Sequence, residues 1–282
     1  MKISIILPMF NHISTIEHTL TCILKQTYRN IEVIIIDDNS TDGCSEVAKK
    51  YSKKYSNFFY KKINTKLESK FYNGINVDAG TTACNEALKY IKGEFVWNFG
   101  DEVFLNNSLE IMVGYLKELK CEHLIVDAIS VSEDLFPIIH QKKFDFDKYK
   151  KENKINFYNS EYLYTIASKQ MGIIEKILPG ISKKFSFNFR NNRILRKIFF
   201  GGFDPLPGTA GSSLIKSSHF KKIKWRNLNE RIWPSFNGRG MDRDLNYRII
   251  REFKNSFYID LPLLTVNFDS NNDQKIIDRY FY

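Results

Sequence analysis

Short apolar runs and amphipathic stretches alternate along the N-terminal third of the chain, a pattern typical of α/β proteins. Apolar runs over 3–7 and 31–36 predict two buried strands, because a continuous apolar run between polar breaks fits a strand covered on both faces. A helix is predicted between them from apolar residues at helical spacing, namely Ile16, Leu20, Ile23 and Leu24. Ser14 and Glu17 are spaced as a capping box for this helix. The unit is therefore β-α-β.

The first strand is broken by Pro8 and has a polar exit at Asn11, and the second ends in a polar cluster over residues 37–43. Because the exits of the two strands lie beside each other in such a unit, we expect a ligand site at this edge of the sheet. The alternative is a plain polar turn in which Thr41 or Asp42 caps the next helix. No G-x-G-x-x-G motif follows either strand, which argues against a dinucleotide site.

Further elements are predicted as a helix over 80–91, strands over 94–98, 124–131 and 212–216, and a helix after 241. Residues 51–70 are interpreted as a solvated helix end and an edge strand. The Gly- and Pro-rich residues 201–211 form either a lid over a substrate or a plain connection.

Composition indicates one sizeable core, because the chain has 282 residues of which 43% are hydrophobic. The four cysteines have no C-x-x-C spacing, so neither a zinc site nor a disulfide framework is predicted, and a reducing compartment fits. Pro8 comes too early for the apolar core of a signal peptide, and no apolar run is long enough to cross a bilayer. We expect a protein that is soluble or bound at a surface.

The formal net charge of +10 is unevenly placed: it is −3 over 1–140, +9 over 141–200 and +4 over 201–282. Residues 168–200 interleave Lys and Arg with large apolar side chains, which favours contact with an anionic membrane surface. The alternative is a pair of amphipathic helices that pack on the core with snorkelling cations. Nucleic acid is not an expected partner, since no recognised binding motif accompanies the charge.

Three stretches together resemble the family 2 glycosyltransferases: I-I-L-P-M-F-N over 5–11, the segment 26–43, and the segment 83–95. The resemblance is dense over residues 1–110 and implies a GT-A type single domain, with a mixed central sheet flanked by helices and a helical basic insertion. It implies a nucleotide-sugar donor, with a preference for UDP, and an inverting transfer to a glycan or lipid-linked glycan. By this resemblance 1–110 is the donor-binding half, 111–260 the acceptor-binding half including the insertion 141–200, and 261–282 a C-terminal tail.

The resemblance also implies donor-binding residues at matching positions. Pro8, Met9 and Phe10 line the base and ribose pocket, and Asp38 accepts a hydrogen bond from the base. The remaining implied donor-binding residues are Asn11, Asn85, Asn98 and Gly100.

Family members usually carry D-x-D at the next acidic edge, where the last carboxylates hold a divalent cation against the donor diphosphate. Here Phe99 stands in place of the first Asp, and the segment 98–101 resembles an N-x-G-D variant. On that alignment Asp101 is the ligand of Mn²⁺ or Mg²⁺, and Glu102 is an outer neighbour or solvated. Alternatively, Asp101 and Glu102 only favour the start of the next helix, which Asn107 would cap.

The second candidate centre is the helix start Met241-Asp242-Arg243-Asp244. The family reads E-D here with an arginine six residues after the Asp, so the resemblance implies Asp242 as the base that takes the proton of the acceptor hydroxyl. Asp244 competes for that role or contacts the acceptor, and Trp233 stacks on a sugar ring or packs in the core. On spacing alone, the two Asp residues are equally typical of a helix start.

The resemblance implies a role in bacterial surface polysaccharide synthesis, in the cytoplasm or peripherally on the inner face of the plasma membrane. The rival from another class is a non-catalytic nucleotide- or glycan-binding protein that kept the fold. It is motivated by Phe99, by Met241 in place of the Glu, and by Cys84 in place of a frequent arginine. A second rival is an anionic-lipid-binding protein led by the basic segment. The sugar, the linkage and the oligomeric state stay open.

Overall fold

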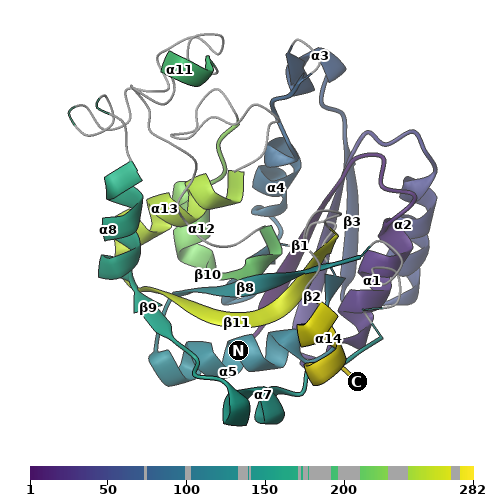
Figure 1. Cartoon of the computed structure of the whole chain (residues 1–282). Helices are drawn as coiled ribbons and strands as arrows, with labels where there is room; N and C mark the ends of the chain where they lie inside the picture. Colours follow the sequence, from purple (N-terminus) through teal and green to yellow (C-terminus); the bar gives the residue numbers. More distant parts are fainter. Residues whose placement is uncertain are drawn as a thin grey trace.

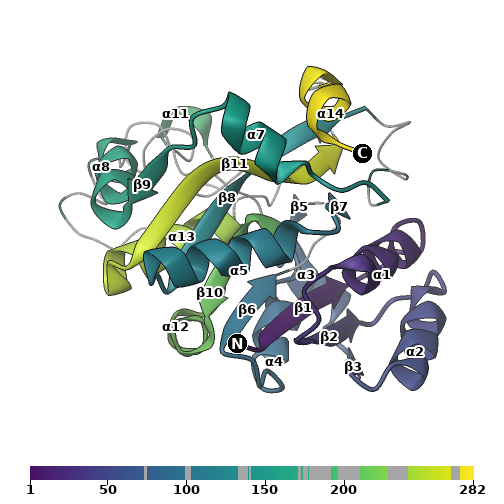
Figure 2. The same ribbon diagram turned by 90° about the horizontal axis from the view of Figure 1, so that it is seen from below.

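The structure is a computed structural model of the chain, and it describes residues 1–72, 75–98, 103–132, 139, 141–170, 173, 177, 192–195, 210–227, 241–267 and 274–282. A twisted sheet runs through the molecule and carries helices on both faces (Figures 1 and 2). This arrangement confirms the predicted α/β class with a mixed, helix-flanked sheet.

Among the described residues, the central sheet has nine strands in the order β3-β2-β1-β6-β10-β8-β11-β7, and β9 pairs with β11 outside this path. Its strands are β1 (Ile3–Met9), β2 (Ile31–Asp38), β3 (Phe58–Ile63), β6 (Phe95–Asn98), β7 (Val103–Phe104), β8 (His123–Val131), β9 (Phe157–Asn159), β10 (Ser213–Lys216) and β11 (Ser256–Asn267). The first four strands in this order are parallel, and β10 then runs antiparallel to both β6 and β8. A separate hairpin joins β4 (Phe71–Tyr72) to β5 (Ile75–Asn76).

Two groups of helices cover the two faces of the sheet. One face carries α1 (Ile16–Lys25), α2 (Cys44–Lys54) and α5 (Ser108–Leu119), and the other carries α4 (Thr81–Ala87), α12 (Ser217–Ile223) and α13 (Met241–Phe253). Further helices are α3 (Leu67–Lys70), α7 (Phe146–Glu152), α8 (Ser160–Gln170), α11 (Arg193–Leu195), α14 (Gln274–Tyr280) and the 3₁₀ turn Ala210–Ser212. Figure 1 shows α8 beside α13, with α11 above it.

The apolar runs of the central strands explain why both faces are covered. In β2, Val33 and Ile35 pack with α1 and α2, whereas Ile34 and Ile36 pack with α4 and α13. Successive side chains of a strand point to opposite faces, so a continuous apolar run needs a helix layer on each side. The buried strands predicted over 3–7 and 31–36 are thus confirmed.

The predicted capping box does not form, and neither does the cap that was the alternative reading of the segment before α5. Helix α1 begins at Ile16, Thr15 occupies the N-cap position without a side-chain cap, and the Ser14–Glu17 capping box does not form. Asn107 precedes α5 but makes no side-chain cap either. Its amide instead pairs with the backbone of Phe144, donating to the carbonyl (2.9 Å) and accepting from the N–H (3.2 Å). A tertiary partner has displaced the local capping bond.

All four cysteines, Cys22, Cys44, Cys84 and Cys121, are buried and free. Burial raises the pKa of Cys22 and of Cys121 to about 12, so these thiols are protonated at neutral pH. In the part of the chain that the structure describes, no helix is both long and apolar enough to span a bilayer.

Candidate active site at the carboxyl edge of the sheet

The polar exits of β1 and β2 are bonded to each other, as the sequence predicted. The Asn11 amide N–H donates to Ser40 Oγ (3.0 Å), and the Thr41 N–H donates to Asn11 Oδ1 (2.8 Å). Asn11 has φ 56°, a left-handed conformation that Asn tolerates better than most residues. Asn11 therefore ties the end of one strand to the loop after the other.

The two carboxylates that end β2 have different surroundings. Asp37 accepts hydrogen bonds from Ser45 Oγ, from Tyr60 Oη (2.7 Å) and from the Ser40 N–H (2.9 Å). Burial alone would raise the pKa of Asp37, but these hydrogen bonds outweigh it and lower the pKa. Asp37 is thus a structural carboxylate that fixes α2 and β3 to the end of β2.

Asp38 forms a buried ion pair with Lys70. Lys70 Nζ lies 3.0 Å from Asp38 Oδ2, donates to the Asp38 carbonyl (2.6 Å), and stands 3.7 Å above the centroid of the Phe10 ring. The other carboxylate oxygen accepts from the Thr65 N–H (3.1 Å). The interpretation of 51–70 as solvated is therefore wrong for Lys70, whose side chain is 3% exposed. In the sequence, Lys70 is one lysine among many, and nothing marks it as buried.

A second carboxylate that the sequence reasoning missed lies close by. Asp78 is 6% exposed and accepts hydrogen bonds from the N–H (3.1 Å) and the hydroxyl (2.6 Å) of Thr82 in the first turn of α4. Burial raises the pKa of Asp78, and the charge of Asp38 adds to this while Lys70 opposes it. A Cβ at Gly80 would lie 3.5 Å from Pro8 Cβ, so α4 begins directly against the end of β1.

Asn85 holds the chain after α12 against α4. Its Nδ2 donates to the Trp225 carbonyl (3.1 Å), and its Oδ1 accepts from the Trp225 N–H (2.9 Å). The side chain predicted to contact the donor is therefore engaged with the backbone of Trp225.

The end of β6 meets the start of α13. Asn98 Nδ2 donates to Asp242 Oδ1 at 3.4 Å, and Cys84 Sγ donates to Asn98 Oδ1 at 3.7 Å. Burial raises the pKa of Cys84 well above its usual value, and the charges of Asp242 and Asp78 add to this, so Cys84 is a thiol donor. Asn98 and Asp242, which are 144 positions apart in the sequence, thus lie together. Asn98 precedes Asp101 by three positions.

Asp244 is engaged with an arginine inside the protein. Its carboxylate is fully buried and bonded to Arg248 Nε at 2.8 Å, while Arg248 also donates to the carbonyls of Ile223 and Lys224. The arginine six residues after Asp242 is therefore the partner of Asp244. The prediction that Asp244 contacts the acceptor does not fit this burial, because no face of the carboxylate reaches solvent.

A buried histidine fixes α13 to the sheet. His123 of β8 bonds through Nδ1 to Ser256 Oγ (3.0 Å) and through Nε2 to Asn246 Oδ1 (3.2 Å). Desolvation is the main cause that lowers the pKa of His123 to about 3, so the ring is neutral in the folded protein.

This histidine predicts an acid-sensitive fold. An unfolded His titrates near pH 6.5 and the folded one near 3, so stability is complete above pH 6.5 and is lost as the pH falls toward 3. A single proton gives a slope of at most about 1.4 kcal/mol per pH unit, or roughly 2 kcal/mol between pH 6.5 and 5. Urea unfolding of the wild type and of His123→Gln at both pH values measures this. An equal pH dependence in both proteins would assign the acid sensitivity to other groups.

Several predicted site residues lie outside the described residues. These are Gly100, Asp101, Glu102 and Trp233, together with Phe99, residues 201–209 and most of the basic segment 168–200. Of the other donor-binding candidates, Met9 is buried, Pro8 and Phe10 are partly buried, and Asn11 is exposed. Within the described ranges, no group of three His, Cys, Asp or Glu side chains is placed to hold a metal ion.

Comparison with known proteins finds related sequences and related folds. The model for Glycosyl transferase family 2 matches residues 4–178. The chain is 29% identical over 115 residues to the UDP-Glc:alpha-D-GlcNAc-diphosphoundecaprenol beta-1,3-glucosyltransferase WfgD of Escherichia coli, covering 40% of each protein. The aligned part of the chain spans 15–40% of the length of the curated relatives it matches.

Two solved structures share the fold. One is S. aureus TarS 1–349 in complex with UDP, with TM-score 0.53 and 16% identity, covering 95% of this chain and 61% of that one. The other is the mannosyltransferase PcManGT from Pyrobaculum calidifontis in complex with GDP-Man and Mn²⁺, with TM-score 0.52 and 13% identity, covering 95% and 57%. At these identities the likeness shows the fold alone.

Proposed function

The chain belongs to glycosyl transferase family 2, and on that premise we propose that it is an inverting glycosyltransferase. It moves a hexose or N-acetylhexosamine from a nucleoside-diphosphate sugar to a hydroxyl of a glycan or lipid-linked glycan, with UDP as the nucleotide that the resemblance favours. The observation that carries the proposal is the contact between Asn98 and Asp242. It brings the sheet edge expected to bind the donor within reach of the carboxylate expected to act on the acceptor.

The donor half is supported by the polar cluster at the exits of β1 and β2. Phe10 offers a flat face to a base, and Asp38 offers acceptor oxygens at the position that the family uses for the base. The Lys70 ammonium group contacts both the Phe10 ring and the Asp38 carboxylate, so binding of a base requires Lys70 to share or release Asp38. A UDP complex in the fold neighbour TarS supports a uridine donor.

Asp242 is the proposed general base of the transfer step. Its carboxylate takes the proton of the acceptor hydroxyl as that oxygen bonds to the anomeric carbon, and the bond from this carbon to the diphosphate oxygen breaks on the opposite face. Asn98 holds one carboxylate oxygen of Asp242, and the partly buried helix start limits the access of water.

A divalent cation completes the proposal, with Asp101 of the N-x-G-D segment as its protein ligand. When bound, such a cation neutralises the charge that develops on the departing diphosphate. The Mn²⁺ in the fold neighbour PcManGT supports a metal of this kind.

Replacing Asp101 is expected to reduce metal-dependent turnover. Asp101→Asn is expected to lower transfer at saturating Mn²⁺ by roughly 10²-fold, because an electrostatic stabiliser of the leaving group is lost. Release of nucleoside diphosphate, measured against Mn²⁺ concentration, checks this. The neighbouring Glu102→Gln is the matched control, and an equal loss in both variants would contradict the assignment to Asp101.

The acceptor is proposed to be a glycan of a bacterial surface polysaccharide, assembled at the cytoplasmic face of the membrane. The name of the relative WfgD specifies a diphosphoundecaprenol-linked acceptor, which supports a lipid-linked one here. A panel of nucleotide sugars with lipid-linked and free glycan acceptors tests the function. Release of UDP that depends on an acceptor supports the enzyme, whereas nucleotide binding without turnover for any acceptor supports the non-catalytic rival.

A further inference from the structure

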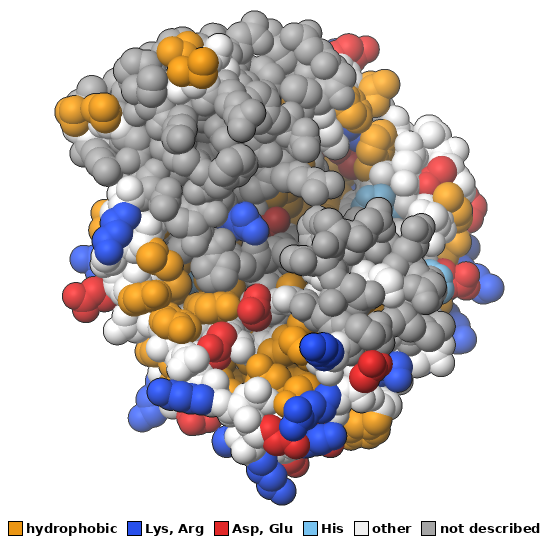
Figure 3. Space-filling view, viewed as in Figure 1, with side chains coloured by type: hydrophobic (Ala, Val, Ile, Leu, Met, Phe, Trp, Pro, Cys, Tyr) orange, Lys and Arg blue, Asp and Glu red, His pale blue; other side chains and the backbone are white. Residues whose placement is uncertain are grey.

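Exposed apolar side chains are frequent along one stretch of the chain. Among the described residues, six of the eleven large hydrophobic side chains that are exposed lie between 157 and 194, and these six are exposed by 42–71%: Phe157, Tyr162, Tyr164, Ile173, Ile177 and Ile194. They lie on β9, on α8, just beyond α8, and on α11. Figure 3 shows hydrophobic side chains on the surface around α8 and at the tip of the molecule where α11 lies. Tyrosines and aliphatic side chains in such numbers are typical of surfaces that enter a membrane interface.

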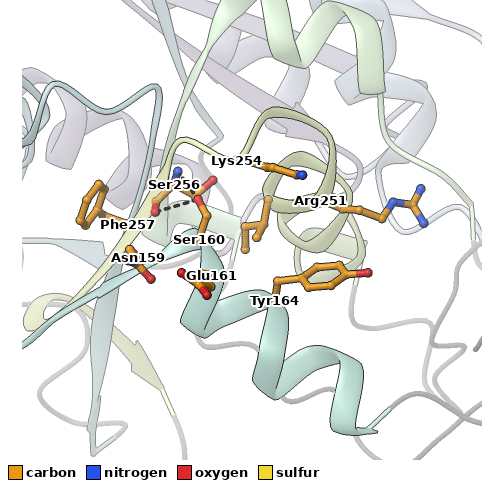
Figure 4. Close-up of a pocket in the computed structure, with 9 residues that line it drawn as sticks. Asn159, Ser160, Glu161, Tyr164, Arg251, Lys254, Ser256 and Phe257 are labelled. Atoms are coloured by element: carbon orange, nitrogen blue, oxygen red, sulfur yellow. Dashed lines mark hydrogen bonds between the residues drawn. The ribbon is translucent and has the colours of Figure 1, made fainter.

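A pocket with a volume of about 770 Å³ opens beside this surface, between α8, β9, the end of α13 and the start of β11 (Figure 4). Ile250 and Ser256 are among its lining residues, and Tyr164 lines it from the side of α8. The last turn of α13 and the residue that follows contribute Arg251 and Lys254. Arg251 lies nine residues after Asp242, which on a helix is about 13.5 Å away, so the pocket is separate from the proposed reaction centre.

The cations of this pocket differ from their neighbours in having no carboxylate within ion-pair distance among the described residues. Arg248 pairs with Asp244 and Lys222 pairs with Glu252, whereas neither Arg251 nor Lys254 forms such a pair. Arg251 is instead held over the buried Tyr247 ring, with its guanidinium carbon 5.7 Å from the centroid. Glu161 also lines the pocket, so the charged side chains among its described lining residues sum to one positive charge.

We propose that this pocket binds the phosphate of an anionic phospholipid headgroup while the exposed side chains of α8 and its neighbours enter the membrane interface. Guanidinium and ammonium groups are the usual partners of phosphate, and Arg251 is already oriented by Tyr247. A headgroup fits better than a free phosphate, because burial of the exposed apolar side chains beside the pocket adds binding free energy only at a lipid surface. Residues 141–200 carry a formal charge of +9, which adds attraction to an anionic leaflet. The inference does not depend on sugar transfer.

Vesicle binding tests the inference. The full chain is expected to bind vesicles that contain phosphatidylglycerol, and the double variant Arg251→Gln/Lys254→Gln to bind them about 30-fold more weakly, since each cation near an anionic surface contributes roughly fivefold. The control Lys50→Gln/Lys53→Gln removes the same charge from exposed positions of α2. Equal weakening by both double variants would overturn the pocket, because it would leave only general electrostatic attraction.

Two further measurements distinguish a lipid headgroup from a soluble phosphate. Ile173→Ser/Ile177→Ser changes side chains that are 57% and 69% exposed, so folding is preserved, and it is expected to weaken vesicle binding about tenfold. Saturation of Arg251 and Lys254 by millimolar glycerol phosphate, with no binding to vesicles, would show a site for soluble phosphate and overturn the headgroup. Turnover of a soluble acceptor is expected to be unchanged in these variants, so a failed vesicle test and a failed glycosyltransferase assay give different results.

Discussion

Replacing Asp242 with Asn is expected to lower the rate constant of sugar transfer by about 10²–10⁴-fold, the range that general base catalysis contributes. The substitution keeps the shape of the side chain and an oxygen that can accept from Asn98, so the start of α13 is preserved. It removes only the ability to take a proton. The affinity for the nucleotide sugar is expected to change by less than about twofold, because the base acts on the acceptor and not on the donor.

The measurement is single-turnover transfer together with nucleotide binding by calorimetry. Asp147→Asn is a matched control, because Asp147 is also an acid in the first helical turn, on α7, and is exposed. An Asp242→Asn protein that transfers sugar within tenfold of the wild type would remove Asp242 from the role of base. Loss of donor binding and turnover together would instead place Asp242 in the donor site.

Replacing Lys70 with Met is expected to destabilise the fold by about 3–5 kcal/mol, the usual effect of removing one partner from a buried ion pair. Asp38 is 4% exposed in its side chain and would be left inside the protein without its cationic partner. The double variant Lys70→Met/Asp38→Asn is expected to recover most of this loss, because it removes the isolated charge.

Urea unfolding without ligand measures both variants, with Lys66→Met as the control for an exposed lysine on the same short segment. That control is expected to stay within about 0.5 kcal/mol of the wild type. A Lys70→Met protein as stable as the control would mean that Asp38 reaches solvent once the lysine is gone. In that case the pair would serve the donor pocket and not the fold.

The sequence predicted the sheet more reliably than the site. The central strands could be identified because β1 and β2 are apolar at nearly every buried position, and because a β-α-β unit places their ends together. The same reasoning located the bonded exits at Asn11 and Ser40. Lys70 and Asp78 could not be found in this way, since their burial depends on packing between segments and not on local periodicity.

The helix that carries Asp242 illustrates the same limit. Asp242 and Asp244 are equivalent in a periodicity argument, and only the structure shows that Asp244 is inside the protein with Arg248. The predicted cap at Ser14 and the alternative cap at Asn107 do not form for a related reason: the capping motif is local, whereas the bond that Asn107 makes is to a segment 37 residues away. Local patterns describe which bonds are available, and tertiary packing selects among them.

Strand β10 imposes an order on the assembly of the sheet during synthesis. It is inserted between β6 and β8, and Leu214 pairs with both Trp97 and Leu124, so the sheet stays open beside β6 until residues 213–216 are made. The 118 residues from 99 to 216 take the ribosome roughly 6–24 s to synthesise. During that interval the nascent N-terminal half presents an unpaired strand edge, which is a target for chaperones and a risk for aggregation.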